Sequence, residues 1–159
     1  MILSNLNILS QNVCKNHLIV NTILKTQSHF DIILIQELPW LVICQVPSNA
    51  NSEGKNLIRT IHHPNWILFT TNPVNKAFSP RVAVYINIRL SPPCFSLRHD
   101  IINHSDILLM SFTNDHIQYF IMNVYSDSSH TTLKYLKDIE VNIDNVLVIT
   151  GDFNIRNSL

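Results

Sequence analysis

The stretch "NVLVITGDFN" (residues 145–154) sets a glycine, an acid and an amide at the end of an aliphatic run. A second stretch, "DIILIQEL" (31–38), has the same form, because its apolar run ends in Glu37 and is stopped by Pro39. Uninterrupted apolar runs of this length, bounded by turn residues, are typical of strands that are covered on both faces. The two stretches therefore predict two interior strands, and the carboxylates of Glu37 and Asp152 follow directly where those strands end.

The composition limits the class of protein. The chain has 159 residues, of which 46% are hydrophobic and 14% charged, as expected for one globular domain. Eleven basic residues balance eleven acidic ones, so the chain has no broad positive field and any contact with nucleic acid must be local. Three widely separated cysteines without metal spacing favour a reducing, intracellular setting. The aliphatic runs are too short to cross a membrane.

The pattern of apolar residues predicts the other elements. We expect a helix at 17–27 and, besides the two interior strands, further strands at 6–13, 65–70, 81–88, 106–113 and 117–125. "NDH" between the last two predicts a hairpin turn, and the segment 46–55 has the composition of an exposed loop. A second helix is predicted to begin after Ser128 or Ser129 as its N-cap. This order predicts an α+β (mixed α/β) fold with a large antiparallel component.

Polar side chains gather where the predicted strands end. Carboxylate, amide and phenol groups at one edge of a sheet offer hard oxygen ligands for Mg²⁺ or Mn²⁺ and neutral donors for a phosphate. Such a set is suited to metal-assisted hydrolysis of a phosphoester. The residues concerned are Asn12, Gln36, Glu37, Asn123, Tyr125, Asp152 and Asn154.

Each of these signals also has a structural explanation. Gly-Asp-x-Asn after a strand is often only a turn in which Asp and Asn cap backbone amides. Glu37 could end a solvated strand, and Tyr125 could be a half-buried aromatic of the sheet. The functional reading depends on their joint occurrence at strand ends.

Five segments, in this order, resemble the endonuclease/exonuclease/phosphatase superfamily, which has the deoxyribonuclease-I-like fold. They are "ILSQNV", "DIILIQE", "RVAVYIN", "YFIMNVYSDSS" and "VLVITGDFN", and they span nearly the whole chain. Within the superfamily, the chain looks like the apurinic-type endonuclease domain of non-long-terminal-repeat retrotransposons. The resemblance implies part of a four-layer α/β/β/α sandwich, with two largely antiparallel sheets flanked by helices.

The resemblance also implies roles for single residues. Glu37 would be the principal metal ligand, and Asn12 would sit beside the Mg²⁺ (or Mn²⁺) and orient that carboxylate or a bound water. Tyr125 would hydrogen-bond the scissile phosphate. Asp152 would orient or deprotonate the attacking water, and Asn154 would donate to a non-bridging oxygen.

Two further residues receive expectations. Gly151 would leave the backbone clear where a phosphodiester approaches, because it has no side chain. Arg81, at the start of a strand inside a matching segment, is the basic residue most suited to contact substrate.

The resemblance also implies that family members continue past "GDFN", through further strands, to a late Asp and a Ser-Asp-His segment. We therefore expect residues 1–159 to be the N-terminal portion of a single domain, without its last strands and catalytically incomplete. Its substrate would be DNA, its setting intracellular and nuclear if functional, and a reverse transcriptase domain would accompany it in a full-length ancestor. The missing part would leave an apolar edge exposed.

Two alternatives stay open at this point. The same core could serve a phosphatase with an inositol phosphate or lipid substrate, because substrate specificity lies in loops. The chain could also be a non-catalytic, degenerate remnant, which the neutral net charge and the low glycine count would suit.

Overall fold

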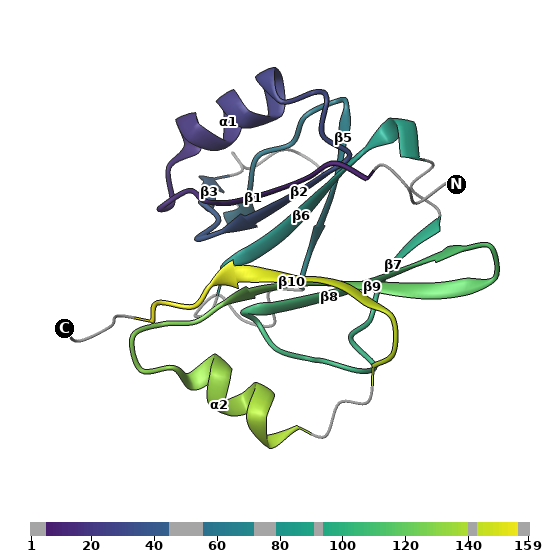
Figure 1. The fold of residues 1–159 in the computed structure, drawn as a ribbon. Helices are drawn as coiled ribbons and strands as arrows, with labels where there is room; N and C mark the ends of the chain where they lie inside the picture. Colours follow the sequence, from purple (N-terminus) through teal and green to yellow (C-terminus); the bar gives the residue numbers. More distant parts are fainter. Residues whose placement is uncertain (1–5, 45–55, 72–78, 91–93, 140–142, 156–159) are drawn as a thin grey trace, which may run out of the picture.

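The computed structural model describes residues 6–44, 56–71, 79–90, 94–139 and 143–155. Two four-stranded sheets form the body of the molecule (Figure 1). The first sheet has the strand order β1-β2-β6-β5 and the second has the order β10-β9-β8-β7. The predicted loop at 46–55 lies outside the described residues.

The first sheet combines one parallel and two antiparallel pairs. β2 lies between β1, which runs parallel to it, and β6, which runs antiparallel. β5 completes the sheet antiparallel to β6. Its strands are β1 (Ile8–Asn12), β2 (Ile32–Gln36), β5 (Trp66–Thr70) and β6 (Val82–Asn87).

The second sheet repeats this arrangement. β9 lies between β10, which runs parallel to it, and β8, which runs antiparallel. The hairpin between β8 and β9 turns at Asp115 and His116, which both have positive φ, as the two-residue turn of type I′ requires. The strands are β7 (Phe95–Leu97), β8 (Ile107–Asn114), β9 (Ile117–Tyr125) and β10 (Val146–Asp152).

Two helices cover the outer faces of the sheets. α1 (His17–Thr26) begins at the N-cap Asn16, whose side-chain oxygen accepts hydrogen bonds from two backbone N–H groups of the first turn. α2 (Thr131–Asp138) does not begin as predicted. His130 is its N-cap in the left-handed conformation, and Asp127 supplies the accepting carboxylate that was expected from a serine.

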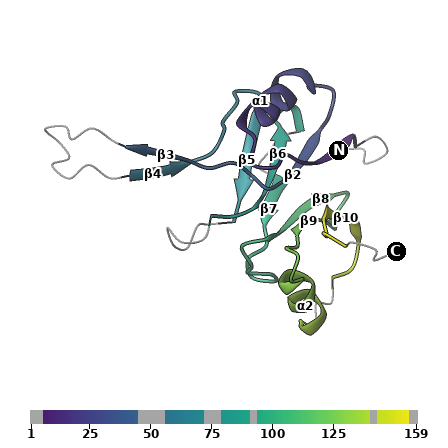
Figure 2. The ribbon, with the colours of Figure 1, turned by 90° about the vertical axis from the view of Figure 1, so that its left-hand side faces the viewer.

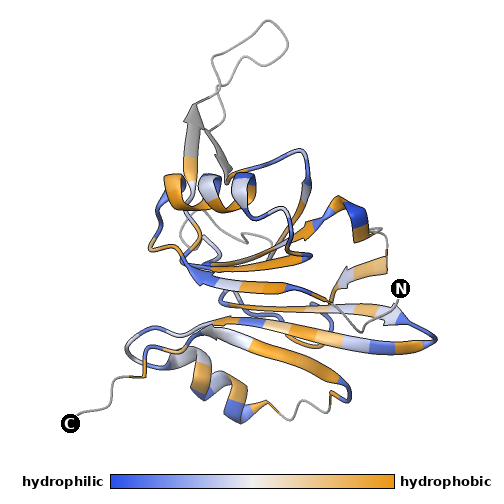
Figure 3. Cartoon of the chain, turned by 45° about the horizontal axis from the view of Figure 1, so that its top comes forward, coloured by the Kyte–Doolittle hydropathy of each residue, from blue (hydrophilic) through white to orange (hydrophobic). Residues whose placement is uncertain are grey.

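Three apolar clusters define four layers. α1 packs on β2 and β6 through Val20 and Leu24. The two sheets pack face to face, with Leu34 of β2 and Met110 of β8 both in the cluster between them. α2 packs on the far face of the second sheet through Leu136. The layer order is α/β/β/α, and Figure 3 shows the hydrophobic residues concentrated on the strands of both sheets. The predicted fold class is confirmed.

The sequence patterns did not predict three short strands. β3 (Leu41–Cys44) and β4 (Asn56–Arg59) pair antiparallel and extend away from the body as a ribbon (Figure 2). β7 has only three residues, and a 3-10 turn, η2 (Ile88–Leu90), follows β6. Within the described residues, no helix has the length and apolar character needed to span a bilayer.

β10 lies at the edge of the second sheet and shows apolar side chains to solvent. Among the described strands it pairs with β9 alone, and Leu147 is 43% and Ile149 58% exposed. The strand has the exposed apolar edge that was expected, but the prediction of an interior strand at 145–150, covered on both faces, is wrong.

Candidate active site

The carboxyl ends of four strands meet at one side of the sandwich, on the left in Figure 1. β1 and β2 run parallel with Asn12 opposite Gln36, and β9 and β10 run parallel with Tyr125 opposite Asp152. Parallel pairing places the ends of neighbouring strands at the same edge of each sheet. The strand ends that the sequence singled out therefore lie together.

Buried polar contacts fix the two sheets in register at this edge. The amide of Asn123, in the second sheet, donates to the carbonyl oxygens of Ile35 and Ala83, both at 2.9 Å, and accepts from Gln36 at 2.6 Å. Asn123 is fully buried and Gln36 is 2% exposed. These two amides were candidates for the polar rim, but their hydrogen bonds join the sheets instead and leave them unavailable to a ligand.

Asn12 lies between the two predicted carboxylates. Its amide nitrogen donates to Glu37 Oε1 at 3.2 Å and to Asp152 Oδ2 at 2.5 Å. Its amide oxygen accepts from the backbone N–H of Cys14 at 2.8 Å, which an amide nitrogen could not do, so the orientation of the group is determined. The structure therefore brings Glu37 and Asp152, which the sequence singled out, to one shared hydrogen-bond donor.

The backbone is strained where two of these side chains begin. Glu37 has φ 52° and Asn154 has φ 47°, both in the left-handed region. Such values are uncommon for residues other than glycine, and for glutamate more so than for asparagine. The carbonyl of Glu37 accepts a hydrogen bond from Lys15 N at 2.9 Å, which holds the turn after β2 against the turn after β1. Strain of this kind is concentrated at functional sites in proteins.

Tyr125, at the end of β9, presents a half-buried phenol beside these acids. Burial, and next the negative charge of Glu37, raise the pKa of Tyr125, and Arg81 opposes them. The guanidinium of Arg81 lies over the Tyr125 ring, 4.3 Å from its centroid. The phenol is therefore protonated at neutral pH and can donate a hydrogen bond.

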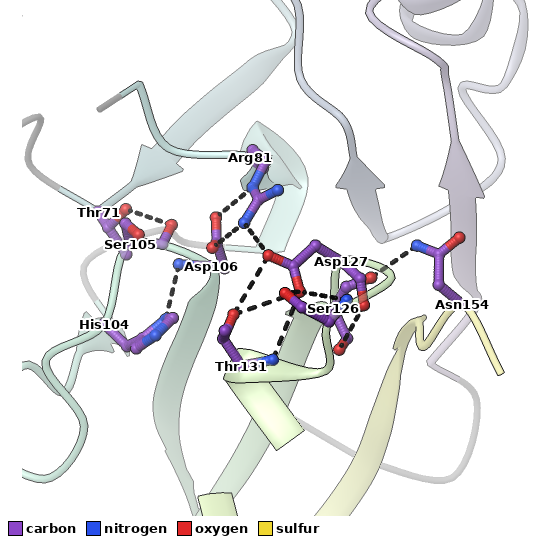
Figure 4. A network of polar contacts seen from close by, with 10 residues as sticks. Thr71, Arg81, His104, Ser105, Asp106, Ser126, Asp127, Thr131 and Asn154 are labelled. Atoms are coloured by element: carbon purple, nitrogen blue, oxygen red, sulfur yellow. Dashed lines mark hydrogen bonds and ion pairs between the residues drawn. The ribbon is translucent and has the colours of Figure 1, made fainter. Parts of the chain in front are cut away.

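Asn154 and Asp152 are held by backbone contacts. The backbone N–H of Asn154 donates to Asp152 Oδ1 at 3.0 Å, so each oxygen of that carboxylate accepts one bond. The side-chain nitrogen of Asn154 donates to the carbonyl of Ser126 at 2.6 Å (Figure 4). One of its two N–H groups is used in this bond, and the other is left to donate elsewhere.

The structure gives a different reason for a glycine at position 151 from the one expected. A Cβ atom built at this position would lie 1.9 Å from the carbonyl oxygen of Val124 in the neighbouring strand. The glycine allows β9 and β10 to approach each other one residue before Asp152. It is β9, and not a substrate backbone, that fills the space a side chain would need.

Arg81 does not offer a free positive charge. Its guanidinium binds Asp106 in the bidentate manner, Nε to Oδ1 at 2.8 Å and Nη2 to Oδ2 at 2.5 Å, and lies 3.9 Å from Asp127 (Figure 4). The carboxylate raises the pKa of Arg81 further. Arg81, which was predicted to contact substrate, is therefore already neutralised by the buried carboxylate of Asp106.

Asp106 supports the site through its contacts with Arg81 and Tyr125, and the sequence patterns did not indicate it. It directly precedes β8, its backbone carbonyl accepts from Tyr125 N at 2.9 Å, and its backbone N–H donates to His104 Nδ1 at 3.0 Å. Asp106 and Arg81 each precede a strand that runs antiparallel to a strand ending at the site. Once the sheet order is known, the antiparallel pairing places Arg81 and Asp106 at the same edge as the ends of β2 and β9.

The donor set is suited to a hard divalent ion. Mg²⁺ in proteins is commonly bound by one or two carboxylates, with water and substrate phosphate completing the shell. Glu37 and Asp152 provide two such carboxylates at one place. The oxygen of Asn12 is used by Cys14, so Asn12 is placed to orient the acids. Within the described ranges, no three His, Cys, Asp or Glu side chains are grouped as a metal site.

The chain was compared with protein-family models, curated proteins and solved structures. A scan against protein-family models found no match, and a search of curated proteins found none either. Among solved structures, the chain is similar to the endonuclease domain of TRAS1, a telomere-specific non-LTR retrotransposon, with 10% sequence identity and a TM-score of 0.45. The match covers 84% of this chain and 50% of that one, so the chain spans about half the length of the TRAS1 domain.

Proposed function

We propose that this chain is a divalent-metal-dependent phosphodiesterase domain of the endonuclease type, with DNA as its substrate. The observation that carries the proposal is the position of Asn12, whose single amide nitrogen serves both Glu37 and Asp152. Two carboxylates held around one donor, next to a phenol, form a site suited to a metal ion and a phosphate. A turn or a solvated strand end alone would not require residues 140 positions apart to meet.

The side chains divide the work of hydrolysis between them. Glu37 would hold Mg²⁺, which when bound supplies positive charge to the phosphate oxygens. Asp152 is oriented by Asn12 on one oxygen and by Asn154 N–H on the other, so it can accept a proton from an attacking water in a defined direction. The Tyr125 phenol and the remaining N–H of Asn154 would donate to phosphate oxygens as charge develops.

The choice of DNA over other phosphodiesters rests on the motifs that resemble retrotransposon endonucleases. The fold itself would equally accept a phosphatase with an inositol phosphate or lipid substrate. A panel of supercoiled plasmid, a phosphoinositide and sphingomyelin, each tested with Mg²⁺ and with EDTA, separates these readings. Hydrolysis of a lipid substrate in place of DNA would overturn the substrate assignment.

The plasmid arm tests the site itself, in this chain and in the chain extended with a C-terminal segment of the family it resembles, because residues 1–159 alone are expected to be catalytically incomplete. Mg²⁺-dependent nicking should be lost in Glu37→Gln and Asp152→Asn, because each removes one of the two charges. Asp100→Asn is the matched control, since Asp100 is an exposed acid that pairs only with Arg98 in the described ion pairs. The proposal is contradicted if the chain neither nicks plasmid nor binds a divalent ion through Glu37.

A further inference from the structure

A cavity of about 540 Å³ lies beside the candidate site and is not used by the chemistry described above. Its walls are the turns after β1 and β2 and the segments that lead into β6 and β8. Arg81 lines the cavity on one side and covers the Tyr125 ring on the other, so the cavity and the site share a wall. The volume is in the range of pockets that hold small organic molecules.

Trp40 gives the cavity a fixed aromatic wall. Its indole N–H donates to the carbonyl of Pro80 at 2.6 Å, which holds the ring against the segment before β6. The ring is half-buried, and Pro39 and Pro80 line the cavity next to it. A half-exposed indole that cannot rotate freely is a platform on which a flat, conjugated group stacks.

Lys15 gives the cavity a positive charge close to Glu37. It has φ 55°, and its backbone N–H bonds to the Glu37 carbonyl, so the base of the side chain is fixed to the turn that carries the acid. Arg81 is paired with Asp106, whereas Lys15 makes none of the ion pairs found among the described residues. Lys15 is therefore the cation of this wall that can bind a phosphate.

His17 adds an imidazole ring to the cavity wall. The residue lines the cavity and is half-buried. An imidazole can donate or accept a hydrogen bond, so it suits the polar edge of a base. An aromatic platform, a cation and an imidazole together match the base, the phosphate and the polar edge of one nucleotide.

We propose that this cavity, the Trp40 cavity, binds a single nucleotide of the DNA strand adjacent to the phosphate held at Glu37 and Asp152. The proposal rests on the proposed function for the identity of the ligand. The base would stack on Trp40, its polar edge would meet His17, and Lys15 would bind the neighbouring phosphate. The nucleotide would thereby set the register of the strand relative to Tyr125.

The first experiment measures nucleotide binding without metal. Trp66 is only 5% exposed, so quenching of tryptophan fluorescence by added thymidine 5′-monophosphate in EDTA reports on Trp40. We expect saturable quenching that is weakened on the order of tenfold in Trp40→Leu, measured by competition with a labelled nucleotide. Trp40→Phe, which keeps an aromatic ring and the fold, should weaken it less. Absence of quenching, or equal affinity in Trp40→Leu, would overturn the proposal.

A charge variant distinguishes stacking from phosphate binding. Lys15→Gln should weaken binding several-fold and reduce its dependence on salt. Lys25→Gln, an exposed lysine in the last turn of α1, should change neither. Thymidine without phosphate should bind more weakly than the nucleotide and be insensitive to Lys15→Gln. If Lys15→Gln and Lys25→Gln behave alike, the phosphate assignment is wrong.

The same variants separate this proposal from the proposed function. Glu37→Gln should abolish nicking without weakening nucleotide binding in EDTA, because it removes a negative charge close to Lys15. Nucleotide binding at Trp40 without nicking would support the nucleotide site and contradict the proposed hydrolysis of DNA. If Trp40→Leu still nicks DNA at the same sites and with the same substrate affinity, the nucleotide site is contradicted and the proposed hydrolysis is supported.

Discussion

The amide nitrogen of Asn12 lies 2.5 Å from Asp152 Oδ2, although 140 positions of sequence separate the two residues. The contact joins the last residue of β1 to the last residue of β10, and therefore one sheet to the other. The same nitrogen also serves Glu37, so a neutral donor relieves the repulsion between two acids.

The first prediction concerns this donor. Asn12→Asp replaces it with a third carboxylate, which would repel both acids and lower the free energy of unfolding by about 1–3 kcal/mol in EDTA. Added Mg²⁺ should restore most of this loss, because three carboxylates bind a divalent ion more tightly than two. Thermal melts with and without Mg²⁺ measure the effect. Asn65→Asp, at an exposed position, is the control and should show no such dependence on Mg²⁺.

A second prediction concerns the support of Tyr125. Arg81→Gln leaves the carboxylate of Asp106 without its bidentate partner, and the Asp106 side chain is only 8% exposed. Breaking a pair of this kind should lower the free energy of unfolding by about 2–4 kcal/mol. Arg98→Gln breaks a pair of the same geometry at the surface, where Asp100 is 62% exposed, and should have little effect. Urea denaturation compares the two, and equal losses would mean that the Arg81 pair is not structural.

A third prediction tests the approach of β9 and β10. Gly151→Ala places a methyl group 1.9 Å from the Val124 carbonyl oxygen, and a backbone atom cannot move aside as a flexible side chain could. We expect β10 to separate locally from β9 and the free energy of unfolding to fall by at least about 2 kcal/mol. Hydrogen exchange of the β10 amides is the measurement. Unchanged protection would show that the strands have more space than the structure describes.

A fourth prediction concerns pH. Burial lowers the pKa of His104, which accepts a hydrogen bond from the backbone N–H of Asp106. A group whose pKa is lower in the folded state contributes stability above its ordinary pKa of 6.5 and loses it as pH falls through the folded value. Denaturation midpoints should therefore decrease below about pH 6.5, and less so in His104→Gln. His62→Gln, at an exposed histidine, should keep the dependence of the parent chain.

The sequence was most informative where burial decides the structure. The run at 32–35 is apolar at every position, and β2 is buried at all five residues, including Gln36 at its end. The predicted positions of both helices and of seven strands follow from the same kind of pattern. Burial is a local property of the amino-acid type, so it can be predicted from periodicity.

The remainder depended on tertiary contacts that no short pattern specifies. β3 and β4 pair across the segment 45–55, and neither shows the alternation that would have indicated a strand. The cap of α2 was assigned to a serine because serine commonly caps, whereas Asp127 reaches the same N–H groups. Arg81 is expected from the sequence to contact substrate, because its pairing with Asp106, 25 residues away, leaves no local pattern. Gln36 and Asn123 were assigned to the rim because pairing across sheets leaves no local trace.

The most direct test of the account is whether one divalent ion binds beside Asn12. In a ¹H–¹⁵N spectrum, substoichiometric Mn²⁺ should broaden the side-chain amide signal of Asn12 selectively, since this group touches both acids. The broadening should disappear in Glu37→Gln, weaken in Asp152→Asn and persist in Asp100→Asn. Broadening that is absent in the parent chain, or that is the same in Glu37→Gln and Asp100→Asn, would contradict a shared metal site at these strand ends.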